Sequence, residues 1–454
     1  MNTLTRGLAC FFLSNAMLTA CSDGGEAAPA SGLLESRVAA QHSASTIDAL
    51  AGLVVGTAGS VELQDLAGPA DCDVTILHVV YETRDPAGEA ATASEGVMIP
   101  TGSGANCTGP RPTLLYAHGT TTLKSYNTAD TANTPEALLV EKFFAAQGYI
   151  VVAPNYLGYD VSSLSYHPYL NADVQAQDMI DGLRAARAEL ATRRDVQASQ
   201  QLFIAGYSQG GHVAMAAFRA IERDYADEFT VTAAAPMSGP YNLVTFGDSV
   251  TSPDGQVNIG GTLFMPYMLT SYQNSYGHIY NVPSDAYQSP FDQYGPTLFP
   301  TDIPVATLMQ EGKLPNDPTF RLLFGPGGLI TDSFRAAYPN SNFRAALQKN
   351  TLLGWSPKAP LTLCGGSEDL TVYFTNTWDM QSDLASRGIN VPVWDLEDRK
   401  SLPSGPTYTD VYDAFQLAKL NAGSQAQMQY HGQLVPPFCF SLIRGFFAQY
   451  LTGG

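Results

Sequence analysis

Residues Gln201–His212 read QLFIAGYSQGGH and carry the strongest signal of the fold. A short apolar run that suits a buried strand leads into Gly206–Gly210 (GYSQG), and the run after it, HVAMAAFRAIERDY, is compatible with a helix. A serine fits a strained strand-to-helix turn only if the residues two before and two after it lack side chains. The sequence therefore predicts a turn that exposes the Ser208 hydroxyl beside the backbone amide of Gln209, an arrangement that indicates acyl-transfer chemistry.

Strand and helix signals alternate on both sides of this turn. Further strands are predicted at 74–83, 96–100, 112–119, 149–155, 230–239, 359–366 and 390–398, and further helices at 137–148, 173–193, 373–387 and 438–451. The first two strands flank Arg84–Gly88 and indicate an antiparallel hairpin. The remaining alternation predicts an α/β protein with a mainly parallel sheet covered by helices on both faces.

The segment 241–355 breaks this rhythm and is rich in tyrosine and phenylalanine. A chain of 454 residues is long for one domain, so we expect a catalytic domain, 46–240 and 356–454, with 241–355 inserted as a cap or lid. Apolar spacing predicts a helix near 259–274. Most of the aromatic side chains are expected to pack the core of the cap, and a minority lining an acyl or aryl pocket is the alternative.

The first residues of the chain indicate export. One arginine, an apolar stretch from about 8 to 18 and then small residues are typical of a secretory signal, 1–20, and the stretch is too short to span a membrane. The letters LTAC ending at Cys21 resemble the lipobox of bacterial lipoproteins, so lipidation of Cys21 is expected, with ordinary cleavage nearby as the alternative. Residues 21–45 show no period and predict a flexible tether. The expected location is the outer membrane, the periplasm or the medium of a bacterium.

Four cysteines remain after the signal besides Cys21. In an oxidising compartment four cysteines favour two disulfides, and three pairings are possible. We predict the sequence-local pairs, Cys72 with Cys107 and Cys364 with Cys439. Buried free thiols are the alternative.

The formal net charge of −19 restricts the partners of the chain. An acidic protein repels phosphate backbones, so nucleic acid is not an expected partner, and a strongly anionic substrate is disfavoured. A neutral ester or amide is compatible with this charge. No metal site and no cofactor are predicted, and the oligomeric state is left open.

A serine hydroxyl needs a base within hydrogen-bond reach and a carboxylate that orients the base. Of the seven histidines, His431 is the predicted base, because it is expected in a loop after the final strand, downstream of every other element of the sheet. His212 lies one turn into the helix after Ser208 and is expected to face away from the hydroxyl. A solvent-exposed loop histidine is the alternative reading of His431.

The predicted acid is Asp369, which stands just after the end of the strand 359–366. Glu368 is the first competitor and Asp395, at the end of the next strand, is the second. The order Ser208, Asp369, His431 is the one that strand–turn–helix serine hydrolases use. The predicted bridge from Cys364 to Cys439 would tie the acid and base segments together.

Negative charge develops on the carbonyl oxygen during attack and needs preorganised donors. The Gln209 amide is the first predicted donor. The second is expected from the loop after the strand 112–119, where Thr120 and Thr121 are both open as the source. The loop reads HGTT, unlike the HGGG of many esterases.

Together the segments TLLYAHGT, PNYLGYD, SYHPYLNADVQAQDMIDGLRAAR, IAGYSQGGHVAMAA and CGGSED…YHGQLVPPFC resemble the secretory lipase family of α/β-hydrolases, from about Cys72 to the C-terminus. The resemblance implies an α/β-hydrolase fold and carboxylic-ester hydrolysis without a cofactor. It places the nucleophile on Ser208, the acid on Asp369 and the base on His431. In the family the HPYL loop lies beside the active site, but His167 in that loop is interpreted as structural.

The expected function is that of an exported serine carboxylesterase or lipase that works through an acyl-enzyme. A serine peptidase on the same fold is one alternative, although no repeat of a propeller domain precedes the hydrolase segment. A surface-binding lipoprotein without catalysis is the other, although no predicted triad residue is missing.

Overall fold

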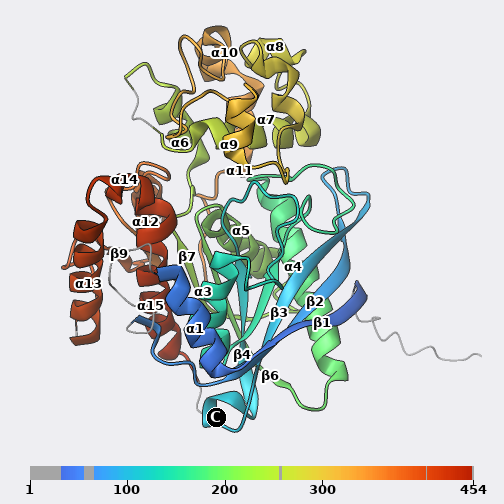
Figure 1. Ribbon diagram of the computed structural model, residues 1–454, viewed down its shortest axis with the longest axis vertical. Coiled ribbons are helices and arrows are strands. Elements are labelled where there is room, and N and C mark those ends of the chain that lie inside the picture. Colours follow the sequence, from blue (N-terminus) through green and yellow to red (C-terminus); the bar gives the residue numbers. More distant parts are fainter. Residues whose placement is uncertain (1–31, 56–65, 255–257, 405, 452–454) are drawn as a thin grey trace, which may run out of the picture. The chain divides into compact units, whose positions relative to one another are not determined.

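The computed structural model describes residues 32–55, 66–254, 258–404 and 406–451 (Figure 1). Nine strands of the described part form one sheet in the order β1-β2-β3-β5-β4-β6-β7-β8-β9. Their bounds are β1 Leu33–His42, β2 Asp73–Arg84, β3 Ala90–Thr101, β4 Pro110–Ala117, β5 Ile150–Pro154, β6 Gln197–Tyr207, β7 Val231–Met237, β8 Leu363–Gly365 and β9 Val393–Asp395. The pairs from β1 to β5 are antiparallel and those from β5 to β9 are parallel, which confirms the predicted α/β class.

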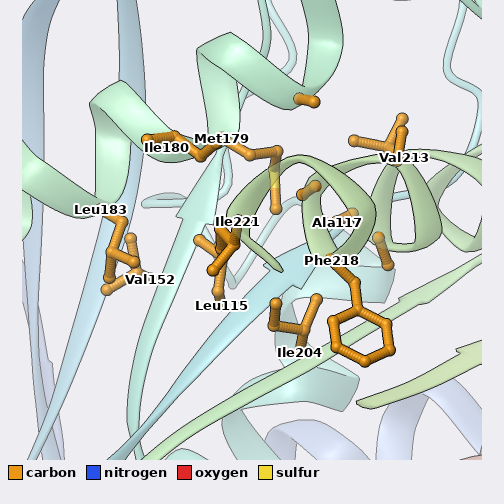
Figure 2. Close-up of a cluster of buried hydrophobic side chains, with 14 of the residues drawn as sticks. Leu115, Ala117, Val152, Met179, Ile180, Leu183, Ile204, Val213, Phe218 and Ile221 are labelled. Carbon is orange, nitrogen blue, oxygen red and sulfur yellow. The ribbon is translucent and has the colours of Figure 1, made fainter. Parts of the chain in front are cut away.

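Helices cover both faces of this sheet. Their bounds are α1 Ala44–Val55, α3 Pro135–Phe143, α4 Ala172–Thr192, α5 Gln209–Asp224, α12 Thr375–Ser386, α13 Pro406–Ala422, α14 Ala426–Gln429 and α15 Val435–Ala448. Helices α4 and α5 pack on one face, where Leu115 and Ile204 of the strands contact side chains such as Leu183 and Phe218 (Figure 2). Helices α1, α3, α13 and α15 share a second cluster of buried side chains with the strands. Strands with apolar side chains on both faces are what a parallel sheet between helices requires.

The antiparallel hairpin is confirmed. Strands β2 and β3 pair along their whole length, from Asp73 opposite Thr101 to Arg84 opposite Ala90. The turn is closed by backbone hydrogen bonds from Asp85 N–H to the carbonyl of Glu89 and from Gly88 N–H to the carbonyl of Asp85.

The predicted tether is wrong from Leu33 onward. Residues Leu33–His42 form β1, which pairs antiparallel with β2, and Ala44–Val55 form α1. Most side chains of β1 are exposed. An edge strand of this kind is held by backbone hydrogen bonds along one side, so it needs no alternating apolar pattern, and the absence of a period was misleading. Residues 1–31, with the predicted signal and Cys21, lie outside the described residues.

Short helices between β7 and β8 surround a third core. They are α6 Leu243–Thr251, α7 Gly261–Tyr276, α8 Pro283–Ala286, α9 Val305–Gln310, α10 Asp332–Ala337 and α11 Asn342–Asn350, coloured yellow-green to orange in Figure 1. Helix α7 confirms the helix predicted near 259–274. Most aromatic residues of the segment pack within this core, among them Tyr267, Tyr272 and Tyr287, as expected. The boundaries of the cap at 241 and 355 stay a prediction.

Both predicted disulfides are confirmed. Cys72 pairs with Cys107, and Cys364 pairs with Cys439. The first bridge joins the start of β2 to the segment before β4, and the second joins β8 to α15. No helix among the described residues has the length and apolarity needed to cross a membrane.

Candidate active site

Ser208 occupies the turn between β6 and α5, with φ 60° and ψ −122°. This is a strained conformation for a residue with a side chain. A Cβ on Gly206 would lie 2.2 Å from the carbonyl oxygen of Gly210, and a Cβ on Gly210 would lie 1.9 Å from that of Ala117. Both glycines are therefore required by backbone crowding, and they allow β4 and β6 to approach the turn.

The structure brings Ser208, His431 and Asp369 together in one hydrogen-bonded chain. The distance from His431 Nε2 to Ser208 Oγ is 2.7 Å, and the distance from His431 Nδ1 to Asp369 Oδ2 is 2.5 Å. The Asp369 carboxyl is buried, while Ser208 keeps 8% of its surface exposed. This geometry lets the imidazole accept the serine proton while the carboxylate orients the opposite ring nitrogen.

Backbone contacts hold the acid and the base in place. The other oxygen of Asp369, Oδ1, accepts hydrogen bonds from the backbone amides of Thr371 and Val372, at 2.8 and 3.1 Å. The carbonyl of His431 accepts a hydrogen bond of 2.6 Å from the hydroxyl of Tyr207, the residue before the candidate nucleophile.

The expectation that His431 lies in a loop is wrong. It lies in a π-helical turn, Tyr430–Leu434, that leads directly into α15. A π turn is a frequent feature of functional sites and carries the side chain out of the regular helical spacing. Since α15 also carries Cys439, the disulfide to Cys364 ties the base segment to the strand that precedes the acid.

The two competing carboxylates are engaged elsewhere. Glu368 lies 3.1 Å from Lys419 Nζ and its side chain is 62% exposed. Asp395 Oδ1 accepts hydrogen bonds from the backbone amides of Ser367 and Glu397, at 2.9 and 3.0 Å. Asp369 is therefore the carboxylate that contacts His431.

Of the predicted oxyanion donors, Gln209 follows Ser208 at the start of α5, and Thr120 and Thr121 follow the end of β4. Among the described residues, no hydrogen-bond partner is found for the backbone amide of Gln209, nor for those of Thr120 and Thr121. A Cβ on Gly119, just before Thr120, would lie 3.7 Å from Ser208 Cβ, which shows how closely this loop approaches the serine. Both threonine amides stay candidates for the second donor.

Tyrosine side chains anchor the loop that carries the threonines. The carbonyl of Thr121 accepts hydrogen bonds from the hydroxyls of Tyr159, at 2.9 Å, and Tyr267, at 2.7 Å. The hydroxyls of Thr120 and Tyr169 lie 2.8 Å apart. Tyr267 belongs to α7, one of the helices α6 to α11 between β7 and β8, which together are referred to below as the inserted segment. This segment therefore helps to shape the candidate oxyanion loop.

Three buried histidines near the site are held neutral by their surroundings. Burial lowers the pKa of His118 to about 4, that of His167 to about 3 and that of His212 to about 4. His167 Nδ1 lies 2.7 Å from the Leu157 carbonyl, so its Nε2 can accept a hydrogen bond from the side-chain amide of Gln209, 2.6 Å away. This contact agrees with the structural interpretation of His167, because the imidazole orients the side chain of Gln209.

Glu136, at the start of α3, lies next to the candidate oxyanion loop. Sequence reasoning missed this residue. Glu136 is partly buried, and its carboxyl accepts hydrogen bonds from the Tyr116 hydroxyl, at 2.7 Å, and from the Gly119 backbone amide, at 2.9 and 3.1 Å. Burial raises its pKa to about 7, against the opposing effect of these hydrogen bonds. A glutamate in the first turn of a helix carries no signal that separates it from a surface residue.

An apolar hollow lies between α6, α7 and α11. Its lining includes Phe246, Val250, Phe264, Met268 and Leu347. Asn258, also in the lining, donates a hydrogen bond of 2.8 Å to the carbonyl of Thr371, two residues after Asp369. Among the described residues, no group of three or more His, Cys, Asp or Glu side chains could hold a metal ion.

Comparison with known proteins agrees with this architecture. Residues 137–245 match the model of the prolyl oligopeptidase family, which is an α/β-hydrolase domain. No curated protein matches the chain. The rice cell wall degrading esterase LipA from Xanthomonas oryzae is 30% identical, with a TM-score of 0.75 over 93% of this chain and 99% of the esterase.

Two further solved structures share the fold. A putative hydrolase from Legionella pneumophila is 21% identical, with a TM-score of 0.69 over 92% of this chain and 98% of the other. Lipase A from Candida antarctica, in its closed state, is 14% identical, with a TM-score of 0.55 over 89% of this chain and 95% of the lipase. The fold is therefore that of an α/β-hydrolase, and the resemblance drawn from the sequence motifs is confirmed. The chain belongs to the secretory lipase and esterase family of α/β-hydrolases.

Proposed function

We propose that this hydrolase is a serine carboxylesterase that acts through an acyl-enzyme. The observation that carries the proposal is the hydrogen-bonded chain from Ser208 through His431 to Asp369. His431 takes the proton of Ser208 as the hydroxyl attacks the ester carbonyl, and Asp369 stabilises the imidazolium. The protonated His431 then gives its proton to the leaving alcohol, and a water activated by the same imidazole releases the acid.

The oxyanion of the tetrahedral intermediate is stabilised by the Gln209 amide and by the amide of Thr120 or Thr121. An amide without a partner at such a position is available to a developing negative charge, and loss of one donor costs about 3–4 kcal/mol of barrier. The side chain of Gln209 is oriented by His167, which limits the motion of the first donor.

The substrate is proposed to be a neutral ester with an apolar portion. Apolar side chains line the hollow whose margin, at Asn258, contacts the acid loop. A net charge of −19 disfavours anionic substrates. The LipA esterase, the relative at 30% identity, is described as degrading rice cell walls, so an acyl group carried on a polysaccharide is one candidate ester.

Replacement of Ser208 by alanine tests the proposal. Hydrolysis of p-nitrophenyl butyrate should fall to background, and a fluorophosphonate probe should no longer label the protein. Ser199→Ala, a change earlier in the same strand β6, should keep full activity and labelling. Substantial turnover by Ser208→Ala would refute the assignment of the nucleophile.

A serine peptidase is the second candidate, favoured by the match of residues 137–245 to the prolyl oligopeptidase family. The same triad cleaves amides on this fold. Matched ester and amide substrates that share one acyl group separate the two functions. Faster cleavage of the amide, after correction for intrinsic reactivity, would favour the peptidase. Absence of turnover with absence of labelling would favour the non-catalytic binding lipoprotein.

Export is proposed from the two disulfides together with the signal-like first 20 residues. Cys21 is the proposed lipidation site and would attach the protein to a membrane. Radiolabelled palmitate should appear in the full-length protein and disappear in Cys21→Ser. A wild-type protein without label would leave ordinary secretion as the route.

A further inference from the structure

Glu136 is a partly buried acid that the candidate triad does not use. It is the second residue of α3, after Pro135, so its carboxyl lies in the first turn of the helix, where a negative charge is favourable. A buried carboxyl is costly unless its oxygens are hydrogen-bonded, and here two donors meet them, the Tyr116 hydroxyl and the Gly119 amide.

The contact to Gly119 is geometrically tight. Both carboxyl oxygens lie within 3.1 Å of the Gly119 nitrogen. A Cβ on Gly119 would lie 3.3 Å from Glu136 Oε2 and 3.4 Å from the carbonyl oxygen of Tyr207. The peptide of Gly119 is therefore confined between the carboxyl and the residue that precedes Ser208.

The next amides along the chain are the candidate oxyanion donors. Gly119 is followed by Thr120 and Thr121, and the carbonyl of Thr121 is held at the other end by two tyrosine hydroxyls. A short loop fixed at both ends has little freedom to rotate its central peptides. Donors of an oxyanion hole must be preorganised, since reorganisation during attack raises the barrier.

We propose that Glu136 is a positioning residue for the oxyanion hole, which it holds in place through the Gly119 amide. The inference rests on the proposed function. It assigns to Glu136 no contact with the substrate and no proton transfer. The bond that matters is the hydrogen bond from Gly119, so the requirement is for an acceptor at the correct distance and not for a negative charge.

Three variants at Glu136 separate the effect of side-chain length from the effect of negative charge. Glu136→Gln keeps the length and an acceptor oxygen for Gly119, and its amide can donate to the oxygen of Tyr116. Glu136→Asp keeps the charge but is one methylene shorter. Glu136→Ala removes the acceptor. With p-nitrophenyl butyrate we expect the Gln variant within about 3-fold of the wild-type kcat, and the Asp and Ala variants lower by about 10- to 100-fold with KM little changed, because the interaction matters in the transition state.

The matched control is Glu141→Ala. Glu141 is a second glutamate of α3 and is buried, but its carboxyl contacts the imidazole of His42, 2.9 Å away, at the side of β1. This variant should lose stability comparably and keep its kcat. Thermal unfolding of every variant reports whether it is folded, and the comparison between Gln and Asp holds if the alanine variant does not fold.

The outcomes are distinct. A Gln variant as slow as the Ala variant, or an Asp variant as fast as wild type, would overturn the positioning role in favour of charge or of no role. A change in KM with constant kcat would also overturn it. Wild-type protein that neither hydrolyses the ester nor reacts with a fluorophosphonate would overturn the proposed function itself, whereas activity in wild type and in Glu136→Ala alike would overturn only the role of Glu136.

Discussion

The sheet region and the inserted segment contribute to the candidate site in different ways. In the sheet region, Ser208 follows β6, Asp369 follows β8, and His431 is tied to β8 through the disulfide from Cys364 to Cys439. The inserted segment supplies none of these three side chains. It contacts the candidate oxyanion loop, through the Tyr267 hydroxyl and through the backbone amide of Thr301, which donates a hydrogen bond of 2.8 Å to the Thr122 carbonyl.

The inserted segment therefore packs a core of its own and also contacts the loop that carries the candidate donors. In the structure described, its hydrogen bonds reach the loop that carries the candidate donors. A displacement of α7 would break the bond to Thr121 and loosen that loop. Changes to the candidate triad in the sheet region should therefore abolish chemistry, whereas changes at this contact should lower kcat in a graded way.

The largest expected effect is in the sheet region. Asp369→Asn should lower kcat by about 10³- to 10⁴-fold, because an amide stabilises the wrong tautomer of the imidazole. Asp395→Asn, which changes the acid of the next strand, should lower kcat by less than about 10-fold, since catalysis in a triad depends on the carboxylate in contact with the base. Steady-state kinetics with p-nitrophenyl butyrate measures both. Equal losses would make Asp369 a structural residue.

The two disulfides provide the next comparison. Replacing both cysteines of either pair by alanine should cost about 4 kcal/mol of unfolding free energy on the loop-entropy estimate, for separations of 35 and 75 residues. Only loss of Cys364–Cys439 should also lower the activity of the folded protein, because that bridge joins the acid and base segments. Urea unfolding and activity below the transition test this. Equal activity in the two double variants would show that the Cys364–Cys439 bridge does not hold the acid and base segments in their active positions.

The contact of the inserted segment with the loop is tested by Tyr267→Phe. Loss of one of two hydrogen bonds to the Thr121 carbonyl should lower kcat by about 10-fold or less, with a smaller change in KM. Tyr272→Phe is the matched control, since this tyrosine of α7 donates 3.2 Å to the Leu170 carbonyl, away from the loop. If both variants behave alike, the contact has no specific role in the hydrolysis.

The smallest effect concerns pH and stability. Burial raises the pKa of Asp178 to about 7 and that of the neighbouring Glu95 well above its usual value. The folded protein thus keeps protons that the unfolded chain releases above about pH 4, so stability should fall as pH rises from about 4 to 7 and beyond.

Glu95→Gln should reduce this fall, because neither carboxyl oxygen of Glu95 has a partner among the described residues and the amide does not ionise. The midpoint of thermal unfolding at pH 5 and pH 8 measures the slope. Glu82→Gln, at an exposed position on β2, should leave the slope unchanged. A steeper fall in Glu95→Gln than in wild type would contradict this account.

Local rules explain why much of the molecule could be predicted from its amino acids. The turn at Ser208 depends on two glycines within two residues of it, so it is visible in the chain itself. Apolar runs and helical periods likewise marked the parallel strands and α4, α5 and α15, because a sheet buried on both faces demands them. Ser208 and Asp369 follow the carboxyl ends of the parallel strands β6 and β8, a placement that the predicted strands indicate.

Other features arose from contacts between distant segments. Strand β1 has an exposed surface and depends on the backbone of β2, so its sequence carries no period. The π turn at His431 and the hydrogen bond from the Gly119 amide to Glu136 depend on how α15 and α3 pack beside β8 and β4. Among Asp369, Glu368 and Asp395, chain position alone left three acids open, and the direction of the backbone after β8 selected one. Residue types and local spacing could thus specify the reacting groups. The residues that hold these groups in place could be identified only in the tertiary structure, because burial and hydrogen-bond partners depend on neighbours in space.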